Sequence, residues 1–205
     1  MKVLAIGKNY VLNAEDLKTT TKSGKQLIFS KPESSLTKDN KDVAYPAFTE
    51  NLVYEVELVV EIGKTGKNIA EADAASYISG IAVGIDYTAK DVLNDVRESK
   101  GPWDLAKGFD GAAPISPVKA VSNFADLKNI NFDLKINGDT VQEGNTGLII
   151  YNFEEIIAFV SQYFTLEPGD LIFTGTPAYG TGQIHKGDHL QASIEGELLL
   201  DFKMI

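Results

Sequence analysis

The sequence predicts an α+β fold, rich in strands and with few helices, as a single domain spanning residues 1–205. Residues 51–62 alternate apolar and polar side chains over the length of a long strand. The dipeptide Asn137-Gly138, which readily supplies the positive φ angles of a tight hairpin turn, separates two further strand-like runs. The clearest helical spacing of apolar side chains is found in residues 152–163. Strands therefore outnumber helices along the chain.

The first third of the chain predicts three strands. Apolar runs place them over residues 1–6, 27–30 and 51–62. In the third strand the even-numbered residues from Tyr54 to Ile62 form the apolar face, and the glutamates occupy the opposite face. A short helix is then expected over residues 70–78.

Two predicted elements flank Asp86. The apolar run 80–85 predicts a strand that ends directly before this acid. Residues 88–91 have the spacing of a capping box, which predicts a helix that runs toward Glu98 and ends at Gly101-Pro102. Asp86 is therefore expected at the mouth of a turn between a strand and a helix.

The second half of the chain predicts a hairpin, one helix and three strands. Residues 130–136 and 140–142 form the two sides of the hairpin. Asn152 and Glu155 are placed as a capping pair at the start of the helix that runs to Tyr163. Strands are also expected over residues 171–174, 190–194 and 198–203, with a glycine-rich stretch at 175–182.

Composition excludes several classes of protein. The hydrophobic fraction of 43% and the charged fraction of 23% are those of an ordinary soluble globular protein. No apolar run approaches the ~20 residues of a membrane helix. The chain has no cysteine, which excludes disulfides and thiolate catalysis. Its first residues form too short an apolar run for a signal peptide, so a cytoplasmic location is expected.

The charge balance indicates a small-molecule partner. The chain has 29 acidic residues against 19 lysines and arginines, a net charge of −10, and its only arginine is Arg97. Such a chain is poorly placed to neutralise the phosphates of a nucleic acid. If the ligand is itself an anion, a metal ion or a positioned lysine must overcome the field of the protein.

Glu55 and Glu57 are the most informative pair of residues in the chain. Side chains two residues apart on a strand leave the same face, with their Cα atoms roughly 7 Å apart, which suits two ligands of one hard cation. A strand with one solvated face would also explain the pair. Asp86 favours a metal site over a solvated strand face, because an acid directly after an apolar strand can be held rigidly in a site. Three carboxylates without histidine or cysteine favour Mg²⁺, then Mn²⁺ or Ca²⁺.

A positive side chain near these acids would balance their charge. Three carboxylates and one divalent ion leave one negative charge, with room for water and a chelating substrate. Lys107, between the aromatic residues Trp103 and Phe109, is the best candidate, although an isolated lysine is most often a solvated surface charge. The loop 174–177 offers hydroxyls and backbone amides that could hold a substrate carboxylate, or it is a plain turn.

Six ordered segments, spread over almost the whole chain, resemble the fumarylacetoacetate hydrolase family. They are residues 6–10, 29–36, 54–58, 84–91, 103–110 and 168–177. Because the chain begins at the first of them, it resembles the short form of the family, without the additional N-terminal domain of some members. The resemblance implies a mixed, strand-rich roll and a homodimer. It also implies that Glu55, Glu57 and Asp86 hold one Mg²⁺ or Mn²⁺.

The resemblance also assigns groups that contact the substrate. The family's site lysine falls on Lys107 and its substrate-contacting threonine on Thr176, and we expect Tyr10 and Gly175, in matching segments, at the substrate as well. Family members act on small 2-keto or β-keto acids. Such an acid would chelate the metal through its keto and carboxylate oxygens. The metal, with Lys107 on the second side, would stabilise the enolate that forms.

The sequence departs from the family in the short helical lid that follows the first of the six segments. Hydrolytic members carry a histidine and a glutamate, three residues apart, that activate the attacking water. Asn13 and Asp16 occupy those positions here, and asparagine cannot take a proton from water at neutral pH. Asp16 or Glu15 could act as the base, although without a histidine partner. The two histidines, His185 and His189, match no family site and are expected at surface or strand positions.

Three functions are compatible with these residues. The favoured one is a decarboxylase, tautomerase or isomerase that works through a metal-stabilised enolate, because decarboxylation needs no activated water. The second is an acylpyruvate or fumarylacetoacetate-type C–C hydrolase, and the third is a metal-dependent protein that binds keto acids without turnover. Arg97 could reach a distal carboxylate of such a ligand or, as we expect, pair with an acid on its own helix face.

Overall fold

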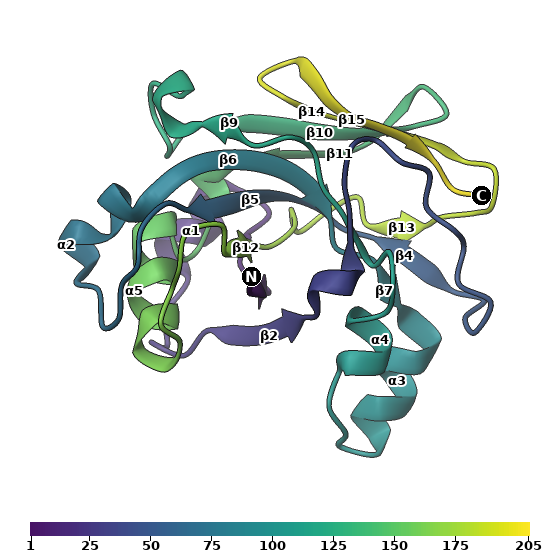
Figure 1. Cartoon of the computed structure of the whole chain (residues 1–205), viewed down its shortest axis with the longest axis horizontal. Coiled ribbons are helices and arrows are strands. Elements are labelled where there is room, and N and C mark those ends of the chain that lie inside the picture. The colour runs from purple at the N-terminus through teal and green to yellow at the C-terminus, as the bar shows by residue number, and fades with distance from the viewer.

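The largest sheet of the protein has six strands and is mixed. The computed structural model describes all of residues 1–205 (Figure 1). The six strands lie in the order β2 (Leu27–Lys31), β1 (Val3–Gly7), β12 (Leu171–Phe173), β5 (Val56–Ile62), β6 (Ile78–Ile85) and β9 (Lys119–Ala120). Only β1 and β12 are parallel neighbours in this sheet.

A second, antiparallel sheet lies over β5 and β6, as Figure 1 shows. Its strands are β11 (Asp139–Asn145), β10 (Asn131–Ile136), β14 (His189–Ile194) and β15 (Glu197–Lys203), in that order. Two smaller sheets complete the set: β13 (Gly182–Gln183), β4 (Leu52–Tyr54) and β7 (Thr88–Ala89), and the parallel pair β3 (Leu36–Thr37) and β8 (Ala113–Pro114).

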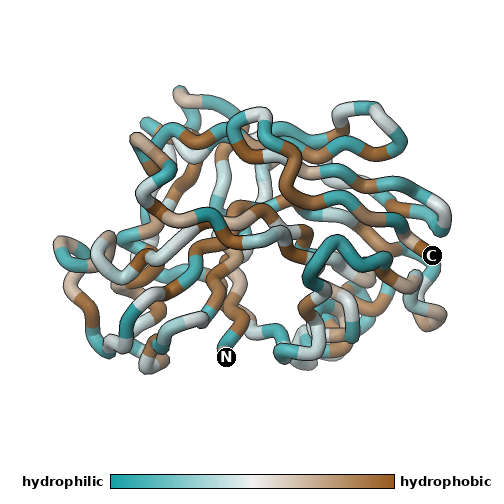
Figure 2. The backbone as a smooth tube through the Cα atoms, turned by 45° about the horizontal axis from the view of Figure 1, so that its top comes forward, coloured by the Kyte–Doolittle hydropathy of each residue, from teal (hydrophilic) through white to brown (hydrophobic).

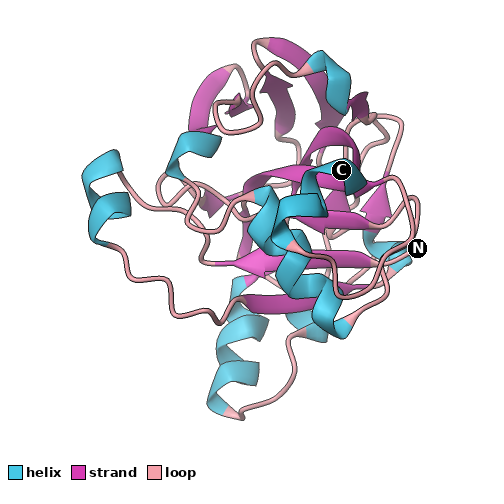
Figure 3. Cartoon of the chain, turned by 90° about the vertical axis from the view of Figure 1, so that its left-hand side faces the viewer, coloured by secondary structure: helices cyan, strands magenta, loops and turns pink.

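Short helices lie around the sheets, as Figure 3 shows. The α-helices are α1 (Ala14–Thr19), α2 (Glu71–Ala74), α3 (Lys90–Glu98), α4 (Asp104–Lys107) and α5 (Phe153–Tyr163), and single 3-10 turns cover Glu33–Ser35, Ala75–Tyr77, Val121–Asn123 and Thr146–Leu148. Helices α3 and α4 lie together near β4 and β7 (Figure 1). None of the helices combines the length and the hydropathy needed to span a bilayer. The predicted strand-rich α+β class is confirmed.

Strand β5 is buried on both of its faces. Its even-numbered side chains, such as Leu58 and Val60, belong to the main hydrophobic core. On the other face, Val59 packs with apolar side chains from β1, β6 and β12. Figure 2 shows apolar residues recurring between polar ones along the extended segments of the chain. Because Glu57 shares the second face and is also buried, the solvated strand face considered from the sequence is wrong.

The strand predicted over residues 51–62 is divided at Glu55. Its first part, β4, pairs with β13 and β7, whereas its second part, β5, pairs with β12 and β6. At this change of sheet, the Val56 N–H donates a hydrogen bond to Gln142 Oε1 at 2.9 Å. Glu55 therefore belongs to neither strand, but two paired strands hold it from both sides.

The helix predicted over residues 70–78 is shorter than expected. Helix α2 ends at Ala74, and one 3-10 turn leads directly into β6. Strand β6 begins at Ile78 instead of Gly80, because it continues its antiparallel pairing with β5 as far as Ile62. The pattern of apolar residues alone could not show where that pairing starts.

The capping box predicted over residues 88–91 does not form. Thr88 is buried in β7, and α3 begins at Lys90 without a side-chain cap. The Asp91 carboxylate instead accepts hydrogen bonds from the Thr49 hydroxyl and from nearby backbone amides. Thr88, which the local pattern assigned to the start of the helix, thus belongs to β7 and pairs with β4 instead.

The hairpin and the long helix form as predicted. Asn137 and Gly138 have φ angles of +54° and +93°, the positive values that a two-residue turn of this kind requires. Asn152 and Glu155 form a complete capping box at the start of α5. Both features depend on neighbours in the sequence, which explains why they were predictable.

Candidate metal centre and active site

Three carboxylates from separate segments converge on one point. Glu55 lies between β4 and β5, Glu57 lies on β5, and Asp86 directly follows β6. The pairing of β5 with β6 sets Val56 opposite Ile85, and the Asp86 N–H donates to the Glu55 carbonyl oxygen at 2.8 Å. One oxygen atom of each carboxylate lies within 4.8 Å of the others. The structure thus brings together the three acids singled out in the sequence.

The acidic cluster is largely removed from water. Glu57 is 2% exposed and Asp86 is 1% exposed, while the Glu55 side chain is 25% exposed. Burial raises the pKa of Glu57 well above its ordinary value, and the negative charges of Asp86 and Glu55 raise it further. Burial also raises the pKa of Glu55. Carboxylates buried in this way require positive charge among them.

Two buried lysines bind the two oxygens of Asp86. Lys107 Nζ lies 2.6 Å from Asp86 Oδ2 and 2.7 Å from Glu55 Oε2, and Lys31 Nζ lies 2.6 Å from Asp86 Oδ1. Burial alone would raise the pKa of Asp86, but the ammonium groups of Lys107 and Lys31 outweigh burial and lower this pKa. Asp86 is therefore ionised at neutral pH even without a metal ion.

Lys107 is a buried residue, not a solvated surface lysine. It is the last residue of α4, and its Nζ lies 5.1 Å from the centroid of the Phe29 ring. The aromatic contact therefore comes from β2 and not from the neighbours in sequence. Burial alone would lower the pKa of Lys107, but Asp86 and Glu55 outweigh burial and raise this pKa.

Lys31 is a site residue that the sequence analysis missed. It is the last residue of β2, and its ammonium group also donates to the carbonyl oxygens of Lys107 and Ala112. It thus connects β2 to the segment that carries Lys107. The one signal for it was its place inside residues 29–36, a segment that resembles the family, since a lysine at a strand end is otherwise typical of a surface.

The loop after β12 holds Glu57 in place. The Gly175 N–H donates to Glu57 Oε2 at 2.8 Å. Gly175 has a φ of +104°, and a Cβ atom there would lie 2.8 Å from the side chain of Asn9, so only glycine fits. Gly175 does not line the cavity. The Gly175 N–H thus positions a carboxylate, and the substrate contact expected from the sequence stays a prediction.

A closed ring of hydrogen bonds fixes Thr176. Its hydroxyl donates to the Val56 carbonyl oxygen at 2.9 Å and accepts from Gln142 Nε2 at 2.8 Å, while Gln142 Oε1 accepts from the Val56 N–H. The Thr176 hydroxyl therefore has no proton left to donate to a substrate. The Thr176 N–H makes no hydrogen bond within the chain. Gln142 was missed in the sequence because its role depends on β11 reaching β5 from the other sheet.

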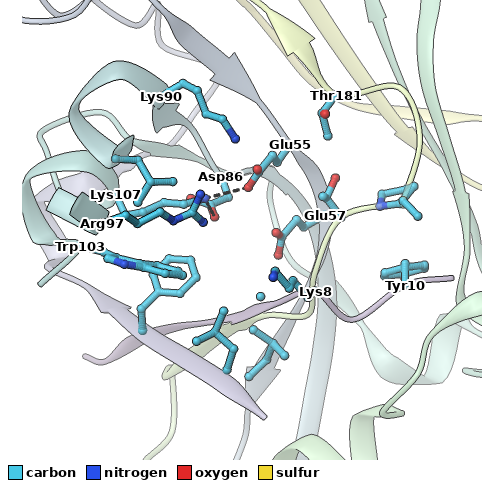
Figure 4. Close-up of a pocket in the computed structure, with 18 residues that line it drawn as sticks. Lys8, Tyr10, Glu55, Glu57, Asp86, Lys90, Arg97, Trp103, Lys107 and Thr181 are labelled. Carbon is cyan, nitrogen blue, oxygen red and sulfur yellow. Dashed lines mark hydrogen bonds and ion pairs between the residues drawn. The ribbon is translucent and has the colours of Figure 1, made fainter. Parts of the chain in front are cut away.

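The three carboxylates and Lys107 line a cavity of about 310 Å³, which Figure 4 shows. Thr176 and Tyr10 also line it. Tyr10 is 7% exposed and its hydroxyl has no hydrogen-bond partner in the protein. Burial, together with the charge of Glu57, raises the pKa of Tyr10, so its phenol is a neutral donor.

Asn13 and Asp16 lie outside this cavity. Asn13 is the N-cap of α1, where its Oδ1 accepts from the N–H groups of Glu15 and Asp16 and its Nδ2 donates to Asp16 Oδ2 at 2.9 Å. The Asn13 side chain is exposed, and the Asp16 side chain is partly buried. Either one would reach the carboxylates only if α1 moved. His185 is exposed and His189 lies on β14, as predicted.

Arg97 does not pair with an acid on its own helix, so that expectation is wrong. None of the residues three or four positions away is acidic, and Arg97 makes no ion pair elsewhere. Its guanidinium instead lies over the ring of Trp103, 5.1 Å from the centroid. Both residues line the cavity and lie on the same side of it in Figure 4.

The cluster fits a divalent metal ion. Its donors are carboxylate oxygens alone, the ligands that hard divalent ions prefer. Burial and the neighbouring carboxylates raise the pKa values of Glu55 and Glu57 even though Lys107 acts in the opposite direction. A divalent ion among the three acids would supply the missing positive charge.

A family model and a curated protein match nearly the entire chain. The model for the fumarylacetoacetate (FAA) hydrolase C-terminal domain matches residues 2–201. The protein named "Oxaloacetate tautomerase FAHD1, mitochondrial" from Bos taurus is 36% identical over 202 residues, which cover 98% of this chain and 90% of that protein. The similarity therefore includes every segment that contributes to the acidic cluster.

Solved structures share the fold over 100% of this chain. The fumarylpyruvate hydrolase from Pseudomonas aeruginosa, in complex with Mn²⁺ and pyruvate, is 31% identical with a TM-score of 0.88 and 90% of its chain covered. The 5-carboxymethyl-2-hydroxymuconate delta-isomerase from Mycobacterium smegmatis is 32% identical with a TM-score of 0.90 and 78% of its chain covered. Together with the family model, these similarities show that the chain is an enzyme of the fumarylacetoacetate hydrolase family.

Proposed function

We propose that the chain is a Mg²⁺-dependent enzyme that acts on small 2-keto or β-keto acids as a decarboxylase, tautomerase or isomerase. The observation that carries the proposal is the buried ammonium group of Lys107 against Glu55 and Asp86 of the acidic cluster, beside a cavity large enough for a small acid. A relative named an oxaloacetate tautomerase and a structure that contains Mn²⁺ and pyruvate both agree with a keto acid at a divalent metal ion.

Lys107 is the residue that would stabilise the reacting oxygen. In this proposal Glu55, Glu57 and Asp86 hold the metal ion, which supplies a Lewis acid to the substrate when it is bound. Lys107 stays protonated at neutral pH, because Asp86 and Glu55 raise its pKa. Its N–H groups stabilise the negative charge that develops on the substrate oxygen as the neighbouring bond breaks or loses a proton.

Two uncharged donors are available for the substrate carboxylate. The Thr176 N–H has no partner in the chain, and the Tyr10 hydroxyl is buried without one. Substrate contact at Thr176 therefore uses its amide, since its hydroxyl proton is bonded to Val56. A carboxylate bound at the Thr176 N–H would satisfy that donor without adding a charge to the wall of the cavity.

Hydrolysis is the second candidate. It requires a base for the attacking water, and in this structure Asp16 is bonded to Asn13 on the exposed end of α1. Decarboxylation and tautomerisation need no activated water, so the absence of a lid histidine harms them least. Binding without turnover is the third possibility, because it needs only the metal ion and the amide donors.

A substrate panel separates the three functions. We expect the protein to turn over oxaloacetate when Mg²⁺ or Mn²⁺ is present, and to lose that activity when a chelator removes the metal. Acetylpyruvate should be cleaved slowly, and a hydroxy-diene diacid tests the isomerase reaction. Cleavage of acetylpyruvate at an ordinary enzymatic rate, about 1 s⁻¹ or faster, would instead favour the hydrolase. Metal-dependent binding of oxalate without turnover of any acid would identify a binding protein.

Asn13→His is expected to raise any hydrolytic activity. A histidine can accept a proton from water, which asparagine cannot, and a positioned base contributes about 10²-fold or more. Initial rates of acetylpyruvate cleavage measure the effect. Asn13→Gln is the matched control, because it changes the cap of α1 without adding a base. An unchanged rate in the histidine variant would mean that α1 does not close over the cavity or that the base lies elsewhere.

We also propose that the chain forms a homodimer, as its resemblance to the family implies. A shallow apolar groove beside the edge strand β2, lined by Phe159, Tyr163 and Phe164, agrees with such a contact. The cytoplasmic location expected from the sequence stays a prediction, since the relative from Bos taurus is named mitochondrial.

A further inference from the structure

The only arginine of the chain faces the cavity without an acidic partner. Arg97 lines the cavity wall, and its guanidinium carbon lies over the Trp103 ring, 5.1 Å from the centroid, within the range of a cation–π contact. Trp103 is itself held by Phe29, whose ring centroid lies 5.6 Å away. Because the Trp103 ring takes no ion pair or hydrogen bond from the guanidinium and no acid pairs with it, the N–H groups of Arg97 are free for a ligand.

Helix α3 supplies Arg97 and two other residues of the cavity wall. Lys90, Leu93 and Arg97 line the cavity and lie on one face of the helix, since they are spaced by three and four residues. Lys90 begins the helix shortly after Asp86. Arg97 lies two turns further along, roughly 10 Å along the helix axis. Arg97 is not among the groups that pair with the three carboxylates, so it can bind a second charged group of a ligand held at them.

The cavity collects positive charge in an acidic protein. Lys8, Lys90, Arg97 and Lys107 line its wall, and the first three make no ion pair. The chain as a whole carries a net charge of −10. With a divalent ion bound to the three carboxylates, the cavity wall would carry a net positive charge. One substrate carboxylate would neutralise only part of this charge. A ligand with two carboxylates matches that excess.

We propose that Arg97, held on Trp103, binds the distal carboxylate of the substrate, so that the enzyme selects keto diacids over keto monoacids. This inference rests on the proposed function, because it takes the near end of the substrate to be a 2-keto acid at the metal centre. The planar fork of a guanidinium can donate two parallel hydrogen bonds to a carboxylate. Leu93 lies between Lys90 and Arg97 on the helix and offers an apolar surface for the carbon chain of the diacid.

The test compares two acids that differ only at the far end. Binding of 2-oxopentanedioate and of 2-oxopentanoate to the Mn²⁺-loaded full chain is measured by isothermal titration calorimetry, with oxalate as a probe of the metal centre alone. We expect the unaltered protein to prefer the diacid. Arg97→Met should weaken diacid binding by about 10- to 100-fold and leave the monoacid and oxalate within about 3-fold.

Two further variants sharpen the comparison. Arg97→Lys keeps the charge but loses the planar fork, so it should retain only part of the preference. Lys100→Met removes a positive charge just beyond the same helix, outside the cavity wall, and should leave the preference unchanged. Methionine is a good helix former, and normal oxalate binding by Arg97→Met shows that the variant is folded.

The outcomes separate this inference from the proposed function. If oxalate binds only with the metal ion but Arg97→Met leaves the preference for the diacid intact, the role of Arg97 is wrong and the metal site stands. Equal weakening of both oxo acids in that variant would also overturn the inference. If oxalate does not bind the Mn²⁺-loaded protein at all, the proposed function fails first.

Discussion

Glu57→Gln is expected to abolish metal-dependent turnover of keto acids. Glutamine keeps the shape of the side chain and can still accept the Gly175 N–H, but it removes one of the three charges that would hold the metal ion. Because a Lewis acid at the substrate contributes several kcal/mol, kcat/KM should fall by about 10³-fold or more. Initial rates with oxaloacetate and Mn²⁺ titrations measure the two effects.

The same change should stabilise the metal-free protein. Burial and two neighbouring carboxylates oppose ionisation of Glu57, so removing its charge relieves repulsion in the folded state. A Tm above that of the unaltered protein is expected, and it would show that lost activity does not come from unfolding. Glu61→Gln is the matched control, because Glu61 lies on the same strand and side-chain face but outside the cavity. Full activity in Glu57→Gln would remove the metal-site model.

Lys31→Met is expected to cause the largest loss of stability. Lys31 and Asp86 are both almost fully buried, and their charged atoms lie 2.6 Å apart. Removing one partner of a buried pair leaves the other charge without its compensation, which costs about 3 kcal/mol even though Lys107 still contacts Asp86. Urea unfolding monitored by circular dichroism measures the change, with Asp86→Asn added to the variant as a rescue.

The rescue and a control variant identify the cause of the loss. If the unpaired charge of Asp86 is responsible, Lys31→Met with Asp86→Asn should recover part of the stability, since both charges are then gone. Lys119→Met removes an exposed ion pair with Glu197 and should change stability by less than about 1 kcal/mol. An equal loss in the single and double variants would show that packing, and not the charge, explains the effect.

The elements that were predictable from the sequence depend on close neighbours in the chain. The alternation in residues 51–62 correctly placed Glu55 and Glu57 on one side, because a strand repeats its side-chain direction every second residue. The turn at Asn137-Gly138 and the cap formed by Asn152 and Glu155 are also local. The capping box predicted at Thr88 was wrong for the opposite reason, since pairing of β7 with β4 overrode the local capping pattern.

The chemistry of the cavity depends on contacts between distant segments. The sequence could name three candidate ligands, but a solvated strand face was excluded only by the packing of β5 between two apolar clusters. Lys31 and Gln142 reach the site from β2 and β11, and Arg97 of α3 contacts the ring of Trp103, which lies just before α4. Residue types and spacing thus established which acids could bind a metal ion. Burial and long-range pairing decided their charge, because desolvation and neighbouring ammonium groups act through space and leave no pattern along the chain.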